Sequence, residues 1–155
     1  MPVRVSIADE QSSLVIDRAR TRDVVRKTLR SEGITDATIS VAFVDDPTMH
    51  DLNRQHLQHD YPTDVLSFLL AGGPEFNDQP SPSGLDGEII VSTDTAIRQA
   101  AEYKWSPQDE LTLYLVHGLL HLCGLDDHTP ADRRLMRARE RDVLQFWDLT
   151  PHYET

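Results

Sequence analysis

The chain has 155 residues, of which 15 are Lys or Arg and 26 are Asp or Glu, so its formal net charge is −11. A chain of this length can bury a core of its own, and its negative mean field disfavours non-specific coating of nucleic acid or of an anionic membrane surface. A local basic patch or a bound cation can still override that field at short range.

Cysteine content and apolar runs indicate the compartment. The single cysteine, Cys123, cannot form an intramolecular disulfide. No segment approaches the roughly 20 apolar residues of a membrane span, and the first residues lack the apolar region of a leader. We therefore expect one cytoplasmic domain over residues 1–155, without membrane contact.

Hydrophobic patterns and helix-start signals place the elements. Apolar alternation or continuous apolar runs predict strands at residues 3–7, 39–44, 64–70 and 88–92. Helical spacing predicts helices at about residues 13–32, 46–56, 93–104, 107–124 and 130–147. The sequence therefore predicts an α+β fold, with a small four-stranded mixed sheet packed by about five helices.

Several boundaries follow from local signals. Ser12 or Ser13 is the expected cap of the first helix, whose buried stripe would begin at Leu14 and Val15. Asp46, followed by proline, is the expected cap of the second helix. Residues 71–87, which are rich in Gly, Pro and Ser, are expected to form an exposed, mobile loop.

Basic residues are unevenly distributed. Between Ser31 and Ile97, Arg54 is the only one, against twelve acids. Two rows at i, i+4 spacing lie elsewhere, one at Arg18, Arg22 and Arg26 and the other at Arg133, Arg137 and Arg141. Each row alone is typical of a solvated helix face, whereas two rows near one cleft would favour an RNA surface.

Residues 117–128 contain the candidate metal ligands. His117 and His121 are four residues apart on a predicted helix, so both imidazoles project from one face and suit adjacent corners of a tetrahedral zinc site. Leaving them unpaired among leucines would cost on the order of 1–3 kcal/mol each. Gly124 permits a sharp exit from the helix, after which Asp127 or His128 can supply a third ligand. Three protein ligands beside an open position are typical of catalytic zinc, placed here at a helix C-terminus.

The residues between the histidines exclude one reaction class. A zincin-type peptidase needs Glu directly after the first histidine as a general base. This chain has Gly118 there, and no carboxylate lies between the two histidines. Peptide hydrolysis by that mechanism is therefore disfavoured.

Separated sequence blocks resemble the YbeY family, the bacterial rRNA maturation factors regarded as metal-dependent endoribonucleases. In chain order the matching blocks are the LN pair Leu52-Asn53, PTDVLSF at residues 62–68, a GDI-type strand at residues 87–92 and HGxLHLxGxDH at residues 117–128. Their order and separations also fit, so the resemblance covers most of residues 40–140.

Two positions depart from the family pattern. The third family histidine falls where this chain has Asp127, so an ungapped alignment makes Asp127 the third ligand, whereas a one-residue insertion would restore His128. We favour Asp127, because zinc accepts a carboxylate readily. The family arginine that follows the LN pair is replaced by Leu57. Arg54, one helical turn earlier, is the hypothetical substitute.

The resemblance implies a single-strand-specific, zinc-dependent endoribonuclease in late 16S rRNA 3′-end maturation and ribosome quality control. Its partners would be single-stranded rRNA, the small ribosomal subunit and an assembly GTPase. The expected roles are ligands of one zinc ion for His117, His121 and Asp127 or His128, an RNA contact for Arg54, and orientation of water or a ligand imidazole for Glu88.

Two other functions stay open. A non-catalytic, zinc-stabilised assembly factor of the small subunit is favoured by Leu57 and by the lack of an obvious general base. A general metal-dependent hydrolase of a small phosphoester is the third alternative.

Overall fold

The computed structural model describes residues 3–56, 64–71 and 84–151. The strands in chain order are β1 (Val3–Asp9), β2 (Ala37–Val44), β3 (Val65–Ala71) and β4 (Leu85–Ser92). The helices are α1 (Arg18–Ser31), α2 (Asp46–His56), α3 (Thr93–Tyr103), α4 (Pro107–Leu122) and α5 (Pro130–Leu144), followed by the short 3-10 helix η2 (Gln145–Trp147).

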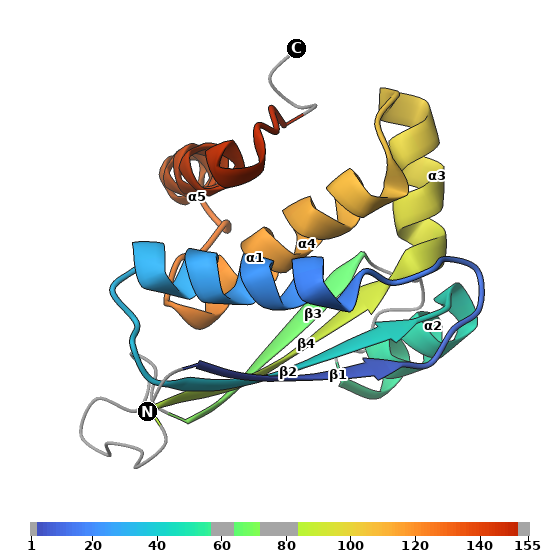
Figure 1. Ribbon diagram of the computed structural model, residues 1–155, viewed down its shortest axis with the longest axis horizontal. Coiled ribbons are helices and arrows are strands. Elements are labelled where there is room, and N and C mark those ends of the chain that lie inside the picture. The colour runs from blue at the N-terminus through green and yellow to red at the C-terminus, as the bar shows by residue number, and fades with distance from the viewer. Residues whose placement is uncertain (1–2, 57–63, 72–83, 152–155) are drawn as a thin grey trace.

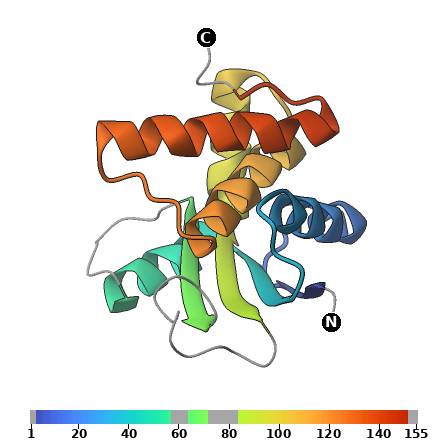
Figure 2. The same ribbon diagram turned by 90° about the vertical axis from the view of Figure 1, so that its left-hand side faces the viewer.

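The strands form one mixed sheet in the order β1-β2-β4-β3. β1, β2 and β4 are parallel, and β3 pairs antiparallel with β4 at one edge. α1 and α4 lie on one face of this sheet with α5 outside α4, whereas α2 lies on the other face (Figures 1 and 2). The predicted α+β class is therefore confirmed.

The main core lies between α1, α4 and the sheet. Ile39 of β2, Ile89 of β4 and Leu119 of α4 are fully buried there. Gly118 faces the sheet, where an added Cβ would stand 3.3 Å from the Cγ2 atoms of both Ile89 and Val65. Because Gly118 has no side chain, α4 can approach β3 and β4 closely. This close packing sets the distance of His117 and His121 from the sheet.

The first helix begins later than predicted. Asp17, not Ser12 or Ser13, is its cap, because the Asp17 carboxylate accepts a hydrogen bond from the Arg20 amide at 2.9 Å. The Ser13 hydroxyl instead hydrogen-bonds with Asp94 of α3 at 3.1 Å. The segment before α1 is therefore tied to α3, and Val15 is 86% exposed rather than part of a buried stripe.

Other boundaries also shift. The α2 cap is Asp45, whose carboxylate accepts from the Thr48 amide at 2.9 Å, not Asp46. The expected loop at 71–87 is wrong at Ala71, the last residue of β3, and at residues 85–87, which pair with β2 as the start of β4. Residues 72–83 lie outside the described part of the chain. None of the described helices has the length and apolar character needed to cross a membrane.

Candidate metal centre

Two imidazoles interrupt an otherwise buried stretch of α4. The helix begins as predicted, with the Ser106 hydroxyl accepting from the Asp109 amide at 3.1 Å. From Glu110 to Leu122 every residue is buried except His117 and His121. Their Nε2 atoms lie 3.1 Å apart, so the convergence predicted from the i, i+4 spacing is present.

The chain then turns back through a Schellman motif. The Gly124 amide donates to the His121 carbonyl and the Leu125 amide to the Leu120 carbonyl, each at 3.0 Å. Gly124 has φ +102°, a backbone conformation that side chains other than glycine rarely adopt. The following residues return towards the helix face, which places Asp127 opposite the two imidazoles.

Asp127 closes a cluster of three potential ligands. Its Oδ2 lies 3.5 Å from Nε2 of His117, and its Oδ1 lies 3.6 Å from Nε2 of His121. Among the described residues, these three each offer one ligand atom within 4.8 Å of the others. Two donors about 2.0–2.2 Å from a tetrahedral ion stand roughly 3.3–3.6 Å apart. The two distances to Asp127 lie in this range and the 3.1 Å between the imidazoles is slightly shorter, so the nitrogen and oxygen donors suit an ion such as zinc.

Glu140 of α5 supports the cluster from behind, and sequence reasoning missed it. Its Oε2 lies 2.6 Å from Nδ1 of His117, and its side chain is only 3% exposed. A carboxylate at this position accepts a hydrogen bond from Nδ1–H of His117. The proton is thereby held on Nδ1, and the lone pair of Nε2 points at the cluster. The sequence carried a signal for the burial of Glu140 but not for its partner, because Glu140 lies at helical spacing from Met136 and Val143 on the buried side of α5.

The two imidazoles differ in proton affinity. Burial lowers the pKa of His117, but the hydrogen bond to Glu140 and the charges of Glu140 and Asp127 outweigh it and raise the pKa above its usual value. Burial, followed by the proximity of His117, lowers the pKa of His121. His121 is therefore neutral and available at neutral pH. The raised pKa means that protons compete with a metal ion more strongly at His117 than at His121, so metal affinity should decrease as the pH decreases.

The other predicted site residues lie outside this cluster. His128 is 81% exposed and its Nε2 pairs with Asp126 Oδ1 at 3.1 Å, so the structure brings Asp127 rather than His128 to the histidines. Arg54 on α2 pairs with Asp51 of its own helix at 2.9 Å.

Glu88 lies within β4 rather than near one of its ends, because the strand begins three residues earlier than predicted. An added Cβ at Gly87 would meet Leu122 of α4, and Ile89 faces Gly118 of the same helix. Since side chains alternate along a strand, Glu88 points to the opposite face of the sheet. The structure therefore does not bring it to either imidazole.

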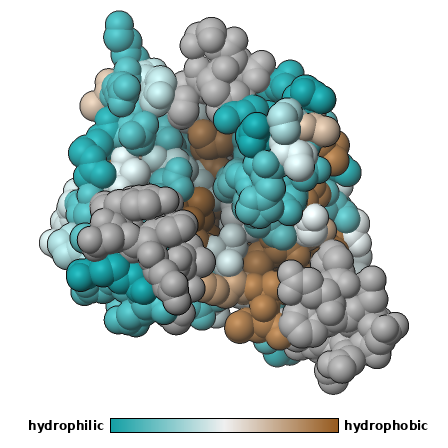
Figure 3. Space-filling model, turned by 180° about the vertical axis from the view of Figure 1, so that it is seen from behind, coloured by the Kyte–Doolittle hydropathy of each residue, from teal (hydrophilic) through white to brown (hydrophobic). Residues whose placement is uncertain are grey.

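A cleft of about 450 Å³ opens beside the cluster. His117 and Asp127 line it, together with residues of α3, the first residue of β3 and two arginines of α5, Arg133 and Arg137. Figure 3 shows a hollow with apolar surface at its floor between hydrophilic surfaces. This volume is within the range of small-molecule sites and suits part of a nucleotide chain.

Tyr114 supplies a polar group in the cleft wall. Its side chain is buried in the wall of the cleft, close to the carboxylate of Glu110. Burial, then the charges of Glu110 and Asp64, raise the pKa of Tyr114. The phenol therefore stays protonated and is a hydrogen-bond donor.

Two histidines on a buried helix and one carboxylate from the turn after it, at the edge of a small mixed sheet, define a class of α+β proteins equipped to hold one metal ion beside a cleft. Within that class the chain belongs to the YbeY family. The family model described as "Endoribonuclease YbeY" matches residues 6–148. The chain is thus a member of a family of RNA-cleaving hydrolases that act in rRNA processing.

Similarity to individual relatives extends over nearly the whole chain. It is 38% identical over 143 residues to an Endoribonuclease YbeY of Salinibacter ruber, covering 92% of this chain and 91% of the relative. It is 39% identical over 158 residues to that of Pelotomaculum thermopropionicum, covering 97% and 99%. A solution structure from Thermotoga maritima shares the fold, with TM-score 0.59, 22% identity and coverage of 99% and 96%.

Proposed function

We propose that this protein is a zinc-dependent endoribonuclease specific for single-stranded RNA, acting in the cytoplasm in late 16S rRNA 3′-end maturation and ribosome quality control. The observation that carries the proposal is the convergence of His117, His121 and Asp127 beside a cleft that His117 and Asp127 line, in a chain of an endoribonuclease family. The partners proposed are single-stranded rRNA, the small ribosomal subunit and an assembly GTPase.

His117, His121 and Asp127 are the proposed ligands of one zinc ion. When bound, zinc supplies Lewis-acid stabilisation of phosphodiester oxygens and acidifies water. Glu140 keeps the Nδ1 proton of His117 in place, so that Nε2 stays directed at the cluster. The buried apolar residues around the two imidazoles hold their rotamers, which keeps the ligand set organised before substrate arrives.

The proposed contact of Arg54 with RNA remains a prediction. Its guanidinium pairs with Asp51, and Arg54 is not among the described residues that line the cleft. Arg54→Glu should abolish RNA cleavage if this guanidinium contacts the bound strand. Turnover equal to that of the unaltered chain would remove Arg54 from the catalytic machinery.

The proposal is tested with two labelled RNAs of one sequence, one single-stranded and one annealed to its complement. The zinc-loaded protein should cleave the first at internal positions and leave the second intact. Failure to cut either RNA, by protein shown to contain one zinc per chain, would favour the zinc-stabilised assembly factor instead. In that case His121→Ala should lower folding stability and binding to the small subunit, without any activity to lose.

A further inference from the structure

Three arginines follow one another along α5. Arg133, Arg137 and Arg141 are exposed and lie at i, i+4 and i+8, so their positions are about 6 Å apart along the helix axis. The other side of the helix, with Met136 and Val143, is buried against the core. We call Arg133, Arg137 and Arg141 the α5 row.

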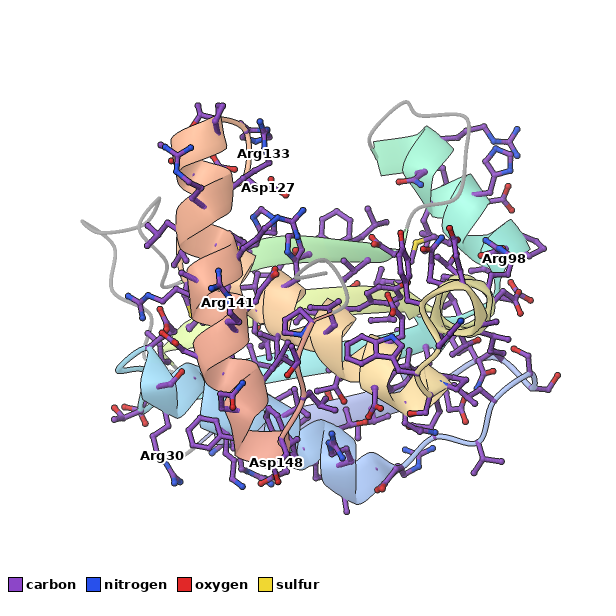
Figure 4. The ribbon with its side chains drawn as sticks, turned by 90° about the horizontal axis from the view of Figure 1, so that it is seen from above. Arg30, Arg98, Asp127, Arg133, Arg141 and Asp148 are labelled. Atoms are coloured by element: carbon purple, nitrogen blue, oxygen red, sulfur yellow. The ribbon has the colours of Figure 1, made fainter. Side chains whose placement is uncertain are left out.

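The α5 row begins at the metal cluster. The Arg133 guanidinium donates to the backbone carbonyls of Asp127 and His128 at 3.3 and 3.4 Å. Arg133 and Arg137 both line the cleft that His117 and Asp127 line. Figure 4 shows Arg133 beside Asp127 at the start of α5 and Arg141 farther along the same helix. The row therefore leads from the candidate site out onto the surface.

Other cations of the fold are placed differently. Arg98 of α3 contacts Asp46, Arg139 of α5 contacts Glu32 at 2.7 Å, and neither is among the described residues that line the cleft. The arginines of α1 are not among the described residues that line the cleft. Figure 4 places Arg30, near the end of α1, on a different side of the molecule from Asp127. Of the two rows that the sequence contains, only the α5 row adjoins the site.

We infer that the α5 row binds successive phosphates of the RNA strand whose scissile bond lies in the cleft. This inference rests on the proposed function. Guanidinium groups match phosphate geometry, and one helical turn between them is comparable to one nucleotide of an extended strand. Because the chain as a whole carries −11, a local row of cations is needed to hold a polyanion near the cluster.

The inference has a consequence for substrate length. The row spans about 12 Å from Arg133 to Arg141, and its last step, about 6 Å from Arg137 to Arg141, leads roughly one nucleotide beyond the cleft. Contacts with phosphates carry no sequence information, so the row should raise affinity for any single strand long enough to reach it. A dinucleotide that occupies only the cleft should gain nothing from Arg141.

The test compares two double variants with the same charge change and the same spacing. Arg137→Gln with Arg141→Gln removes most of the α5 row, whereas Arg26→Gln with Arg30→Gln removes two exposed arginines of α1. Arg133 is left in place because it holds the segment that carries Asp127. All four positions are exposed, and thermal unfolding should show similar melting for the variants and the unaltered protein.

The readouts are affinity for a labelled single-stranded RNA as a function of salt, and cleavage of that RNA and of a dinucleotide. For the α5 pair, Arg137→Gln with Arg141→Gln, the slope of log affinity against log salt concentration should decrease in magnitude by about 1.4. This is the change expected when two phosphate contacts on a single strand are lost. Cleavage of the long RNA at limiting concentration should fall roughly tenfold, a larger loss than for a dinucleotide, which can contact Arg137 in the cleft but does not reach Arg141. The α1 pair should behave like the unaltered protein.

The outcomes distinguish a failure of the inference about the α5 row from a failure of the proposed function. An unchanged salt slope in the α5 pair, or an equal loss in the α1 pair, would overturn the role of the row while RNA cleavage by the unaltered protein still stands. If the unaltered zinc-loaded protein neither binds nor cleaves RNA, the proposed function fails and the inference fails with it.

Discussion

At the scale of single residues, the hydrogen bond between Glu140 and His117 is the contact on which the ligand set most depends. It is 2.6 Å long and joins a nearly buried carboxylate of α5 to an imidazole of α4. Without a charged acceptor at Nδ1, the His117 ring loses both its fixed tautomer and part of its basicity. The affinity of the cluster for zinc should therefore depend on a residue that is not itself a ligand.

Glu140→Gln should lower zinc affinity by about 10- to 100-fold, because the amide keeps the shape but not the charge of the acceptor. Competition with a chromophoric chelator measures this. Asp142→Asn, a charge loss at an exposed position of the same helix, is the matched control and should leave the affinity unchanged. Equal affinities for Glu140→Gln and the unaltered chain would contradict the positioning role.

The identity of the third ligand gives a second prediction at this scale. Asp127→Asn should weaken zinc binding strongly, because Asp127 is the carboxylate that faces both imidazoles. His128→Ala should have little effect, since that ring is exposed and paired with Asp126. The same chelator competition decides between them, and the reverse order of effects would make His128 the third ligand.

How far these residues were predictable depends on their distance along the chain. His117, His121 and Asp127 fall within eleven positions, so helical periodicity and one glycine exit were enough to bring them together. Glu140 reaches His117 only because α5 docks on α4, a tertiary contact that no local pattern encodes. Glu88 was misplaced because one strand boundary determines which position is a strand end.

At the scale of elements, the turn after α4 sets the position of Asp127 relative to the helix. The left-handed Gly124 directs the chain back within three residues, and both Schellman hydrogen bonds are present. α1 ends in the same way at Gly33, which has φ +80° and no neighbouring atom within 4 Å of an added Cβ. The two turns thus share their backbone conformation and hydrogen bonds, but only the turn at Gly124 is followed by a candidate metal ligand.

Gly124→Ala should lower the free energy of unfolding by about 1–2 kcal/mol through backbone strain, and it should also weaken zinc binding by displacing Asp127. Gly33→Ala is the matched control, with a similar loss of stability and unchanged zinc affinity. Denaturant unfolding and metal titration provide the two readouts. A zinc affinity of Gly124→Ala equal to that of Gly33→Ala would show that the turn does not position the ligand.

A second junction joins α2 and α3 at the end of β4. The Asp46 carboxylate accepts hydrogen bonds from Ser92 at 2.6 Å and Thr95 at 2.8 Å and pairs with Arg98. Burial opposes ionisation, but these hydrogen bonds and the Arg98 charge hold the pKa of Asp46 below its ordinary value of 3.8. The stabilisation is therefore present above that value and is lost as pH falls through the lower folded-state pKa.

Asp46→Asn should reduce the free energy of unfolding by about 1–3 kcal/mol at neutral pH. The difference from the unaltered chain should shrink as the pH falls below about 4, where Asp46 becomes protonated in the unfolded state and then in the folded state. Denaturant unfolding at several pH values measures this. Asp51→Asn, which removes one partner of an exposed ion pair, should change the free energy of unfolding little. If Asp51→Asn and Asp46→Asn lowered it equally, the hydrogen bonds at this junction would not be the source of the stabilisation.

At the scale of the whole molecule, the fold places a possible metal-binding cluster at the edge of the sheet and joins it to a basic helix, α5. The class and the number of strands were predictable, because each strand and helix has its own hydrophobic period. The strand order β1-β2-β4-β3 was not, since it depends on pairings between distant segments. The cleft, which needs α3, α4 and α5 in place together, was equally inaccessible to local patterns.

The central claim is that RNA cleavage takes place at the His117, His121 and Asp127 cluster. The most direct measurement titrates metal-free protein with zinc while following cleavage of a labelled single-stranded RNA, with His121→Ala titrated in parallel and its folding checked by circular dichroism. Cleavage should rise until one zinc per chain is bound and should be lost in folded His121→Ala. Cleavage by His121→Ala at the unaltered rate, or none by the fully zinc-loaded unaltered protein, would contradict the account.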